Sequence, residues 1–302
     1  MKHWKTETDD RGVVWLCLDQ AESKVNVLSS EVLRELNDIL DPMSNEPPNG
    51  IIIWSGKNRS FVMGADIKEF TVIDSPERAY ELVRLGQQLL DKLEALSCPT
   101  AAAINGFCLG GGFELAMACD YRIALESDKK IIGLPEVKLG LHPGFGGTVR
   151  AIRIGGVRAG MQLMLSGNPI NPDKAKSLGF VDKISTEDSW RVDTSKLLAA
   201  KPSMQKAPLT DRLLNLKPFR GFVRNMLLKQ VQSKARRDHY PAPYAMIDLW
   251  VNEGASVTTG YEAEAKSFGN LICSDTARNL IRVFFLQTRR RVWRKKTRIR
   301  FL

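Results

Sequence analysis

The sequence lacks the short motifs that mark many nucleotide-dependent and serine-dependent enzymes. It contains no Gly-x-Gly-x-x-Gly, no Gly-x-x-x-x-Gly-Lys-Ser/Thr and no Gly-x-Ser-x-Gly segment. A dinucleotide site, a P-loop and a serine-hydrolase elbow therefore have no support. Histidine is also scarce, because the chain has only three, His3, His142 and His239, which lie far apart in sequence. We therefore expect no histidine-built metal site.

Cysteine is sparse and shows no metal-binding or redox spacing. There is no Cys-x-x-Cys pair, and the five cysteines are scattered among apolar residues, at Cys17, Cys98, Cys108, Cys119 and Cys273. An odd number of dispersed cysteines is typical of reduced core residues rather than of a disulfide framework. The pattern predicts a cytoplasmic protein.

Long apolar runs are nearly absent. The first ten residues are too polar for a signal or transit peptide. The one run that resembles a membrane span, Thr100 to Cys119, is interrupted by Asn105, Glu114 and several glycines. Polar and ionisable residues are costly in a bilayer, so we expect no membrane span.

Positive charge is concentrated at one end of the chain. The net charge is +10, but residues 288–302 hold eight Arg or Lys and no acid, which leaves about +2 for the rest. We interpret this run as a disordered, solvated tail. Binding of the tail to an anionic surface or to DNA is the alternative, and the near-neutral body gives no indication of a nucleic-acid partner.

Strand and helix patterns alternate along the first 190 residues. Short apolar runs predict strands at 13–19, 51–54, 100–104, 121–124 and 179–184. Helical spacing follows Ser29 and recurs at 80–96, 113–118, 159–165 and 172–178. This alternation predicts an α/β fold with a mixed or parallel sheet. Three prolines interrupt 185–220, which we interpret as a linker or a peripheral segment, and helical spacing returns over 220–286.

A glycine-dense turn and two glutamates stand out between Pro99 and Pro143. A strand that ends at Asn105-Gly106 and a helix that starts at Gly110–Gly112 leave backbone N–H groups free, and glycine lets a ligand oxygen come close. Gly64-Ala65 is a similar junction. Two converging N–H groups would form an oxyanion hole.

Glu114 lies within one helical turn of these donors, and Glu136 follows a proline that fixes its backbone. Two carboxyl groups beside an oxyanion hole can add or remove water next to a polarised carbonyl, with one activating the water and the other exchanging a proton at carbon. A packing turn beside a solvated glutamate is the structural alternative, and the spacing alone leaves both interpretations open.

Five ordered motifs identify a family. The sequence resembles the enoyl-CoA hydratase/isomerase (crotonase) family in Met63–Ile67, Ala103–Gly106, Gly110–Glu114, Asp120–Arg122 and Gly133–Gly140. Further segments, Pro143–Gly147, His239–Pro243 and Glu264–Phe268, resemble the N-terminal hydratase part of the multifunctional fatty-acid β-oxidation α-subunit. The resemblance extends over residues 11 to 287 and implies a spiral of ββα units with a C-terminal helical extension.

The resemblance also implies roles for individual residues. The N–H groups of Ala65 and Gly111 would hold the thioester oxygen, Glu114 would activate water and Glu136 would exchange the α-proton. The substrate brings coenzyme A, and no bound cofactor or metal is implied. Contacts with the substrate would come from Met63, Gly64, Asp66, Gly110 and Lys24.

The resemblance further implies a division of the chain and its partners. We expect a hydratase core over 1–189, a linker and helical extension over 190–287 and the basic tail over 288–302. The function implied is 2-enoyl-CoA hydration in β-oxidation, with Δ3-Δ2-enoyl-CoA isomerase activity in addition. Partners implied are acyl-CoA and either a second copy of the chain or a thiolase subunit. Because the family's α-subunit continues into a dehydrogenase part, the alternative is a remnant that binds acyl-CoA or a partner without turnover.

Overall fold

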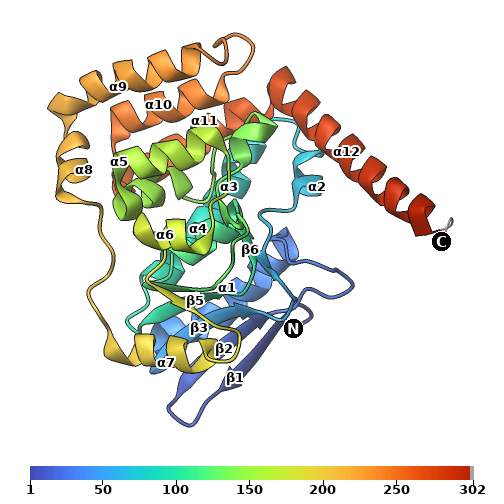
Figure 1. Cartoon of the computed structure of the whole chain (residues 1–302), viewed down its shortest axis with the longest axis vertical. Coiled ribbons are helices and arrows are strands. Elements are labelled where there is room, and N and C mark those ends of the chain that lie inside the picture. The colour runs from blue at the N-terminus through green and yellow to red at the C-terminus, as the bar shows by residue number, and fades with distance from the viewer. Residues whose placement is uncertain (300–302) are drawn as a thin grey trace.

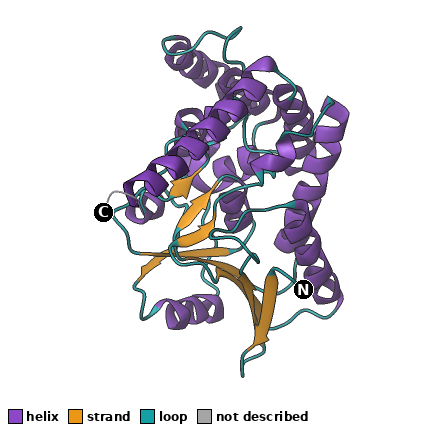
Figure 2. Ribbon diagram, turned by 90° about the vertical axis from the view of Figure 1, so that its right-hand side faces the viewer, coloured by secondary structure: helices purple, strands orange, loops and turns teal. Residues whose placement is uncertain are grey.

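The computed structural model describes the backbone of residues 1–299 and the side chains of residues 1–290. Its strands form a six-stranded and a three-stranded sheet. Strands and helices alternate as far as residue 185, and the described residues beyond that point form helices and loops. Figure 1 shows the helices of residues 217–272 across the top of the molecule, and Figure 2 shows the strands in its middle and lower part.

The large sheet is mostly parallel. Its order is β1 (Trp4–Thr8), β2 (Val13–Leu18), β3 (Gly50–Ser55), β5 (Thr100–Ile104), β7 (Tyr121–Leu125) and β9 (Lys183–Ser185). β1 pairs antiparallel with β2, and each later neighbour is parallel. Apolar side chains fill both faces of its central strands, which is why these segments read as continuous hydrophobic runs.

Alternate residues of β2 enter different cores. Val14 and Leu16 pack with α1 (Ser30–Asn45) and α3 (Pro76–Glu94), whereas Val13 and Trp15 face α7 (Trp190–Ala200). Side chains alternate between the faces of a strand, so a single strand supports both layers. In Figure 1 α7 lies below the sheet and the other labelled helices lie largely above it.

The small sheet positions the segments that carry the candidate site residues. It consists of β4 (Ser60–Val62), β6 (Phe107–Leu109) and β8 (Ile132–Gly133), all parallel. Because the three strands run in one direction, the segments that follow them emerge at one edge of the sheet. Those segments carry Ala65, Gly111 and Glu136, which are far apart in sequence.

The remaining helices surround these sheets. They are α2 (Ile67–Phe70), α4 (Gly111–Met117), the 3₁₀ helix η1 (Glu136–Leu139), α5 (Gly147–Ser166), α6 (Pro172–Ser177), α8 (Leu209–Leu214), α9 (Lys217–Gln232), α10 (Ala242–Glu253), α11 (Val257–Ile272) and α12 (Asp275–Ile299). Within the described part of the chain, no helix has both the length and the apolar character required to cross a bilayer. α11 packs against α3, α10 and α5.

The structure confirms the strands predicted near 13–19, 51–54, 100–104 and 121–124. The strand predicted at 179–184 is wrong in its first half, because β9 begins at Lys183 and the preceding Phe180 and Val181 are buried in a turn. The stretch 185–220, predicted as a linker or a peripheral segment, is partly helical. It contains α7 and α8, and α7 is held by aromatic packing of Trp190 on the sheet.

The basic run 288–302 differs from expectation as well. The sequence predicts a disordered tail, but α12 continues as a helix through Ile299, while residues 300–302 lie outside the described residues. The early turns of α12 bury Ala277 and Ile281 against the body, and Arg and Lys are good helix formers. Figure 1 shows α12 projecting from the body as an arm.

Candidate active site

Two backbone amides meet at the edge of the small sheet. A methyl group built on Gly111 would lie 3.3 Å from the nitrogen of Ala65, and one built on Gly64 would lie 3.9 Å from the nitrogen of Gly111. Neither the Ala65 nor the Gly111 amide donates a hydrogen bond to another described residue. Two adjacent unpaired donors are the arrangement that an oxyanion hole requires.

The glycines before α4 are needed for this geometry. Gly110 has φ 51° and ψ −129°, a conformation that side chains with a Cβ rarely adopt, and a Cβ there would lie 2.8 Å from Glu136 Oε1. A Cβ on Gly112 would lie 2.3 Å from the carbonyl oxygen of Val62. The turn therefore brings β4, α4 and Glu136 closer together than any larger residue would allow.

Glu114 is buried and held through one of its two oxygens. Its Oε1 accepts hydrogen bonds from the backbone N–H groups of Phe145 and Gly147, each at 2.7 Å. Its Oε2 has no partner among the described residues, so this oxygen is free to take a proton from water. Burial, together with the neighbouring charges of Glu136 and Glu264, raises the pKa of Glu114, and the two amides oppose that rise.

Glu136 is held differently. Its Oε2 is buried and has no hydrogen-bond partner among the described residues. Burial raises the pKa of Glu136 to about 8, with a smaller contribution from the charge of Glu264. Two close carboxyl groups titrate as a pair. We assign the proton of that pair to Glu136, because two backbone amides stabilise the ionised form of Glu114, whereas Glu136 has only its own backbone N–H.

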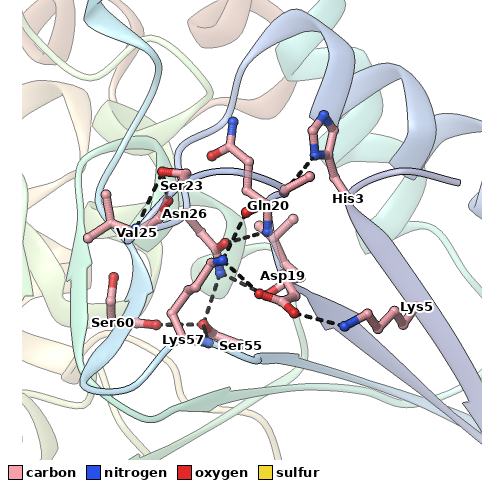
Figure 3. Close-up of polar contacts among 12 residues, drawn as sticks. His3, Lys5, Asp19, Gln20, Ser23, Val25, Asn26, Ser55, Lys57 and Ser60 are labelled. Atoms are coloured by element: carbon pink, nitrogen blue, oxygen red, sulfur yellow. Dashed lines mark hydrogen bonds and ion pairs between the residues drawn. The ribbon is translucent and has the colours of Figure 1, made fainter.

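A second loop leads to the same edge. Asn26 is fully buried; its amide donates to the Leu18 carbonyl at 2.8 Å and to Ser55 Oγ at 2.9 Å, and its own backbone carbonyl accepts from Met63 N at 2.9 Å. Lys57 Nζ donates to the Gln20 carbonyl at 2.8 Å (Figure 3). These contacts fix the loop 19–27 against the strand that delivers Ala65. Sequence reasoning missed Asn26, whose only signal is a polar residue between two valines.

The candidate substrate-binding residues do not all serve the same purpose. Gly64 and Gly110 lie at the unpaired amides, and Met63, beside them, is 36% exposed. Asp66 caps α2, since its Oδ1 accepts from Lys68 N at 3.0 Å. Lys24 is exposed on the loop 19–27. Asp66 thus has a structural role that accounts for its side chain, and Lys24 is available to an anionic ligand.

One group of side chains has the composition of a metal site. His3, Glu31 and Glu35 place ligand atoms within 4.8 Å of one another. However, His3 Nδ1 accepts from Ala21 N at 3.2 Å, so the proton lies on Nε2, which donates to Glu31 at 3.0 Å. Glu35 accepts from the backbone amides of residues 2–4. These bonds leave the imidazole no free lone pair, and we interpret the group as a tie between β1 and α1.

One cavity of the molecule lies away from the two glutamates. A cavity of about 580 Å³ lies at the far end of α4, between that helix and the segment 204–215. Its polar lining includes Arg122, Arg153 and Lys206, and neither Glu114 nor Glu136 contributes to it. The chemistry described above therefore lies outside this cavity.

Comparison with known proteins agrees with the geometry. The profile of the family described as Enoyl-CoA hydratase/isomerase matches residues 8–238. The chain belongs to this family. Family membership confirms the resemblance seen in the sequence, but it assigns no role to any single residue.

Within the family, the chain is similar to the alpha subunits of bacterial fatty acid oxidation complexes. The fatty acid oxidation complex subunit alpha of Shewanella loihica is 38% identical over 287 residues, covering 92% of this chain and 40% of the relative. The corresponding subunit of Vibrio campbellii is 35% identical, covering 95% of this chain and 41% of the relative. The chain therefore spans about two fifths of the length of these relatives.

Solved structures confirm the crotonase-like α/β fold. An enoyl-CoA hydratase from Bacillus anthracis aligns with TM-score 0.60 and 26% identity over 90% of this chain and 92% of its own. Human mitochondrial delta3-delta2-enoyl-CoA isomerase aligns with TM-score 0.70 and 22% identity over 96% of this chain and 99% of its own. The second likeness shows the fold alone.

Proposed function

We propose that the protein is a 2-enoyl-CoA hydratase of fatty-acid β-oxidation. The observation that carries this proposal is the meeting of two unpaired amides, Ala65 and Gly111, with two glutamates of unlike environment, the buried Glu114 and the partly buried Glu136. The family match and the name of the relatives, subunits of a fatty acid oxidation complex, support it.

The proposed reaction uses each group once. Glu114 Oε2 takes a proton from water as the water oxygen bonds to the β-carbon of the enoyl thioester. The electron pair of the double bond moves toward the thioester oxygen, whose negative charge the N–H groups of Ala65 and Gly111 stabilise. Glu136 then gives its proton to the α-carbon. The product is a 3-hydroxyacyl-CoA, and the two carboxyl groups have exchanged protonation states.

The substrate supplies the coenzyme A, and the proposed reaction requires no resident cofactor or metal. We propose that Met63, Gly64 and Gly110 line the thioester and that exposed Lys24 meets a phosphate of coenzyme A. The same site suits Δ3-Δ2 isomerisation, in which Glu136 alone would move a proton between two carbons. The four reacting groups lie within the proposed core 1–189, with 190–287 as the proposed extension.

The test is loss of the enoyl thioester absorbance of crotonyl-CoA and of a longer enoyl-CoA. We expect turnover by the intact chain and formation of 3-hydroxyacyl-CoA. Absence of turnover above that of the double variant Glu114→Gln/Glu136→Gln would remove the proposal.

The rate should also depend on pH in a defined direction. Hydration needs a protonated Glu136, whose pKa is raised to about 8. We therefore expect kcat/KM for hydration to fall as the pH rises through about 8, because the proton donor is lost. This fall of kcat/KM at alkaline pH should be absent from the residual activity of Glu136→Gln. A flat profile between pH 7 and about 9.5, well beyond the raised pKa, would contradict the assignment of the proton.

Exposed apolar side chains on α8 and α9 favour a second candidate. Leu209, Leu213, Phe219 and Phe222 are between 49% and 73% exposed. Such a patch suits a partner, so the chain could bind acyl-CoA and a further subunit, such as a thiolase or a second copy, without turnover. Calorimetric binding of acyl-CoA with no product would favour this candidate, and rapid hydration would eliminate it.

Five free cysteines support our inference that the protein works in a reducing cytoplasm.

A further inference from the structure

A third glutamate lies behind the loop that holds Glu114. Glu264 comes from α11, more than a hundred residues further along the chain, and is fully buried. Both of its oxygens are in use. Oε1 accepts from Gly146 N at 2.6 Å and from Gln87 Nε2 at 2.9 Å, and Oε2 accepts from Thr148 N at 2.9 Å and from the Thr148 hydroxyl.

Successive backbone N–H groups of the loop 145–148 donate alternately to Glu114 and to Glu264. The N–H groups of Phe145 and Gly147 donate to Glu114, and those of Gly146 and Thr148 donate to Glu264. Four consecutive amides thus join one carboxylate of α4 to another of α11. Any shift of the loop that shortens the bonds on one side lengthens those on the other.

Other buried groups hold this arrangement in place. Gln87, fully buried on α3, also donates to the carbonyls of Gly144 and Tyr261, each at 3.0 Å. Arg150 Nη1 donates to the Phe145 carbonyl at 2.7 Å, and its guanidinium pairs with Asp91 and Glu94 of α3. The loop is therefore fixed from three helices. Of these contacts, only those of Glu264 bring a second negative charge close to Glu114 and Glu136.

We propose that Glu264 is a positioning residue, which fixes Glu114 for its reaction with water through the amides of the loop 145–148. This inference rests on the proposed hydratase function. Glu264 does not touch the reacting atoms, since its oxygens are fully occupied by the loop and Gln87. Its hydrogen bonds fix the positions of the Phe145 and Gly147 amides. The hydrogen bonds of those amides in turn fix the position of Glu114 Oε1.

Substitution by glutamine is expected to affect Glu114 and Glu264 differently. In Glu114→Gln the amide carbonyl can take the place of Oε1, which receives both loop N–H groups. In Glu264→Gln no orientation works, because both oxygens accept from donors and the new NH₂ group must face one of them. An unpaired buried donor is costly, so the loop must shift.

The test compares Glu264→Gln with Glu262→Gln. Glu262 lies on the same helix, is exposed and pairs with Lys266, so the same chemical change there should leave hydration unchanged. For Glu264→Gln we expect kcat to fall by up to about 100-fold with KM within a few-fold of wild type, as a misplacement of about 1 Å produces. Thr148→Val, which removes only the hydroxyl donor, should cause a smaller loss in the same direction and serves if Glu264→Gln does not fold.

The pH profile distinguishes positioning from loss of folded protein. Removing the charge of Glu264 lowers the pKa values that it raises, so the alkaline limb of kcat/KM should move to lower pH in Glu264→Gln. The charged and titratable groups around this region are Glu114, Glu136, Arg84, Arg150, Tyr261, His142, Asp91 and Glu94. All of them are unchanged in the variant.

Calorimetry with acyl-CoA gives the fraction of competent sites, to which kcat is normalised. A normalised kcat and a pH limb equal to wild type in Glu264→Gln, or in Thr148→Val if it alone folds, would overturn the inference. If the intact chain hydrates no enoyl-CoA, the proposed function fails separately. Carboxyl-¹³C NMR titration of Glu114 and Glu136 then tests the inference without turnover, since unchanged titration in Glu264→Gln would overturn it and titration at lower pH would support it.

Discussion

Replacement of Glu114 by glutamine is expected to lower kcat for hydration by about 10²- to 10⁴-fold, the range typical of a lost general base. Both loop amides bind the same oxygen of Glu114, Oε1. A glutamine carbonyl can accept both bonds, so the loop should keep its position. The variant therefore removes little besides the basic oxygen Oε2, to which we assign the proton from water. Steady-state kinetics with crotonyl-CoA measure the effect.

The matched control is Glu81→Gln, an exposed glutamate on α3 whose one ion-pair partner among the described side chains is Arg78. It should hydrate at the wild-type rate. Acyl-CoA affinity should be similar in both variants, because the role proposed for Glu114 is to act on water and not on the thioester. A kcat for Glu114→Gln within tenfold of wild type would show that another group activates the water.

Replacement of Glu136 by glutamine is expected to lower kcat for hydration by a similar factor, about 10²- to 10⁴-fold, and to stop a second process that Glu114→Gln leaves intact. That process is exchange of the α-protons of a saturated acyl-CoA with D₂O. Glu136 carries the unpartnered buried oxygen Oε2, and the proposed site has the thioester oxygen held by Ala65 N and Gly111 N. Removing an α-proton from such a thioester needs Glu136 in its ionised form and no attacking water, so the exchange is measured above about pH 8, where Glu136 has lost its proton.

Proton NMR of a bound saturated acyl-CoA in D₂O measures the exchange directly. We expect loss of the α-proton signal with wild type and with Glu114→Gln, and a persistent signal with Glu136→Gln. If Glu136→Gln exchanges the α-protons as fast as wild type, Glu136 is not the group that acts at the α-carbon.

Local patterns made the elements around the site predictable. Buried parallel strands appear in the sequence as unbroken apolar runs, and Ser29 is found as a helix cap where the pattern begins. Glu114 and the glycines lie within a few residues of one another, so their proximity follows from chain connectivity. The small sheet was not predicted, because β4, β6 and β8 have only three, three and two residues.

Long-range contacts account for what the sequence did not reveal. Glu264 accepts hydrogen bonds from loop amides that lie 116 to 118 residues earlier in the sequence. No local periodicity distinguishes it from the exposed Glu262 two residues earlier. Likewise, α7 was interpreted as part of a linker because the stacking of Trp190 on Trp15 and Trp54 depends on strands far away in sequence. The resemblance to a family supplied the roles of Ala65 and Gly111, which spacing alone left open.

The central claim is that two glutamates and two amides of this chain add water to an enoyl thioester. The most direct measurement follows crotonyl-CoA and 3-hydroxybutyryl-CoA together, with the intact chain and with Glu114→Gln/Glu136→Gln at equal acyl-CoA occupancy. We predict stoichiometric conversion by the intact chain and none by the double variant. Equal rates in the two proteins, or no conversion by either while both bind acyl-CoA, would contradict the claim.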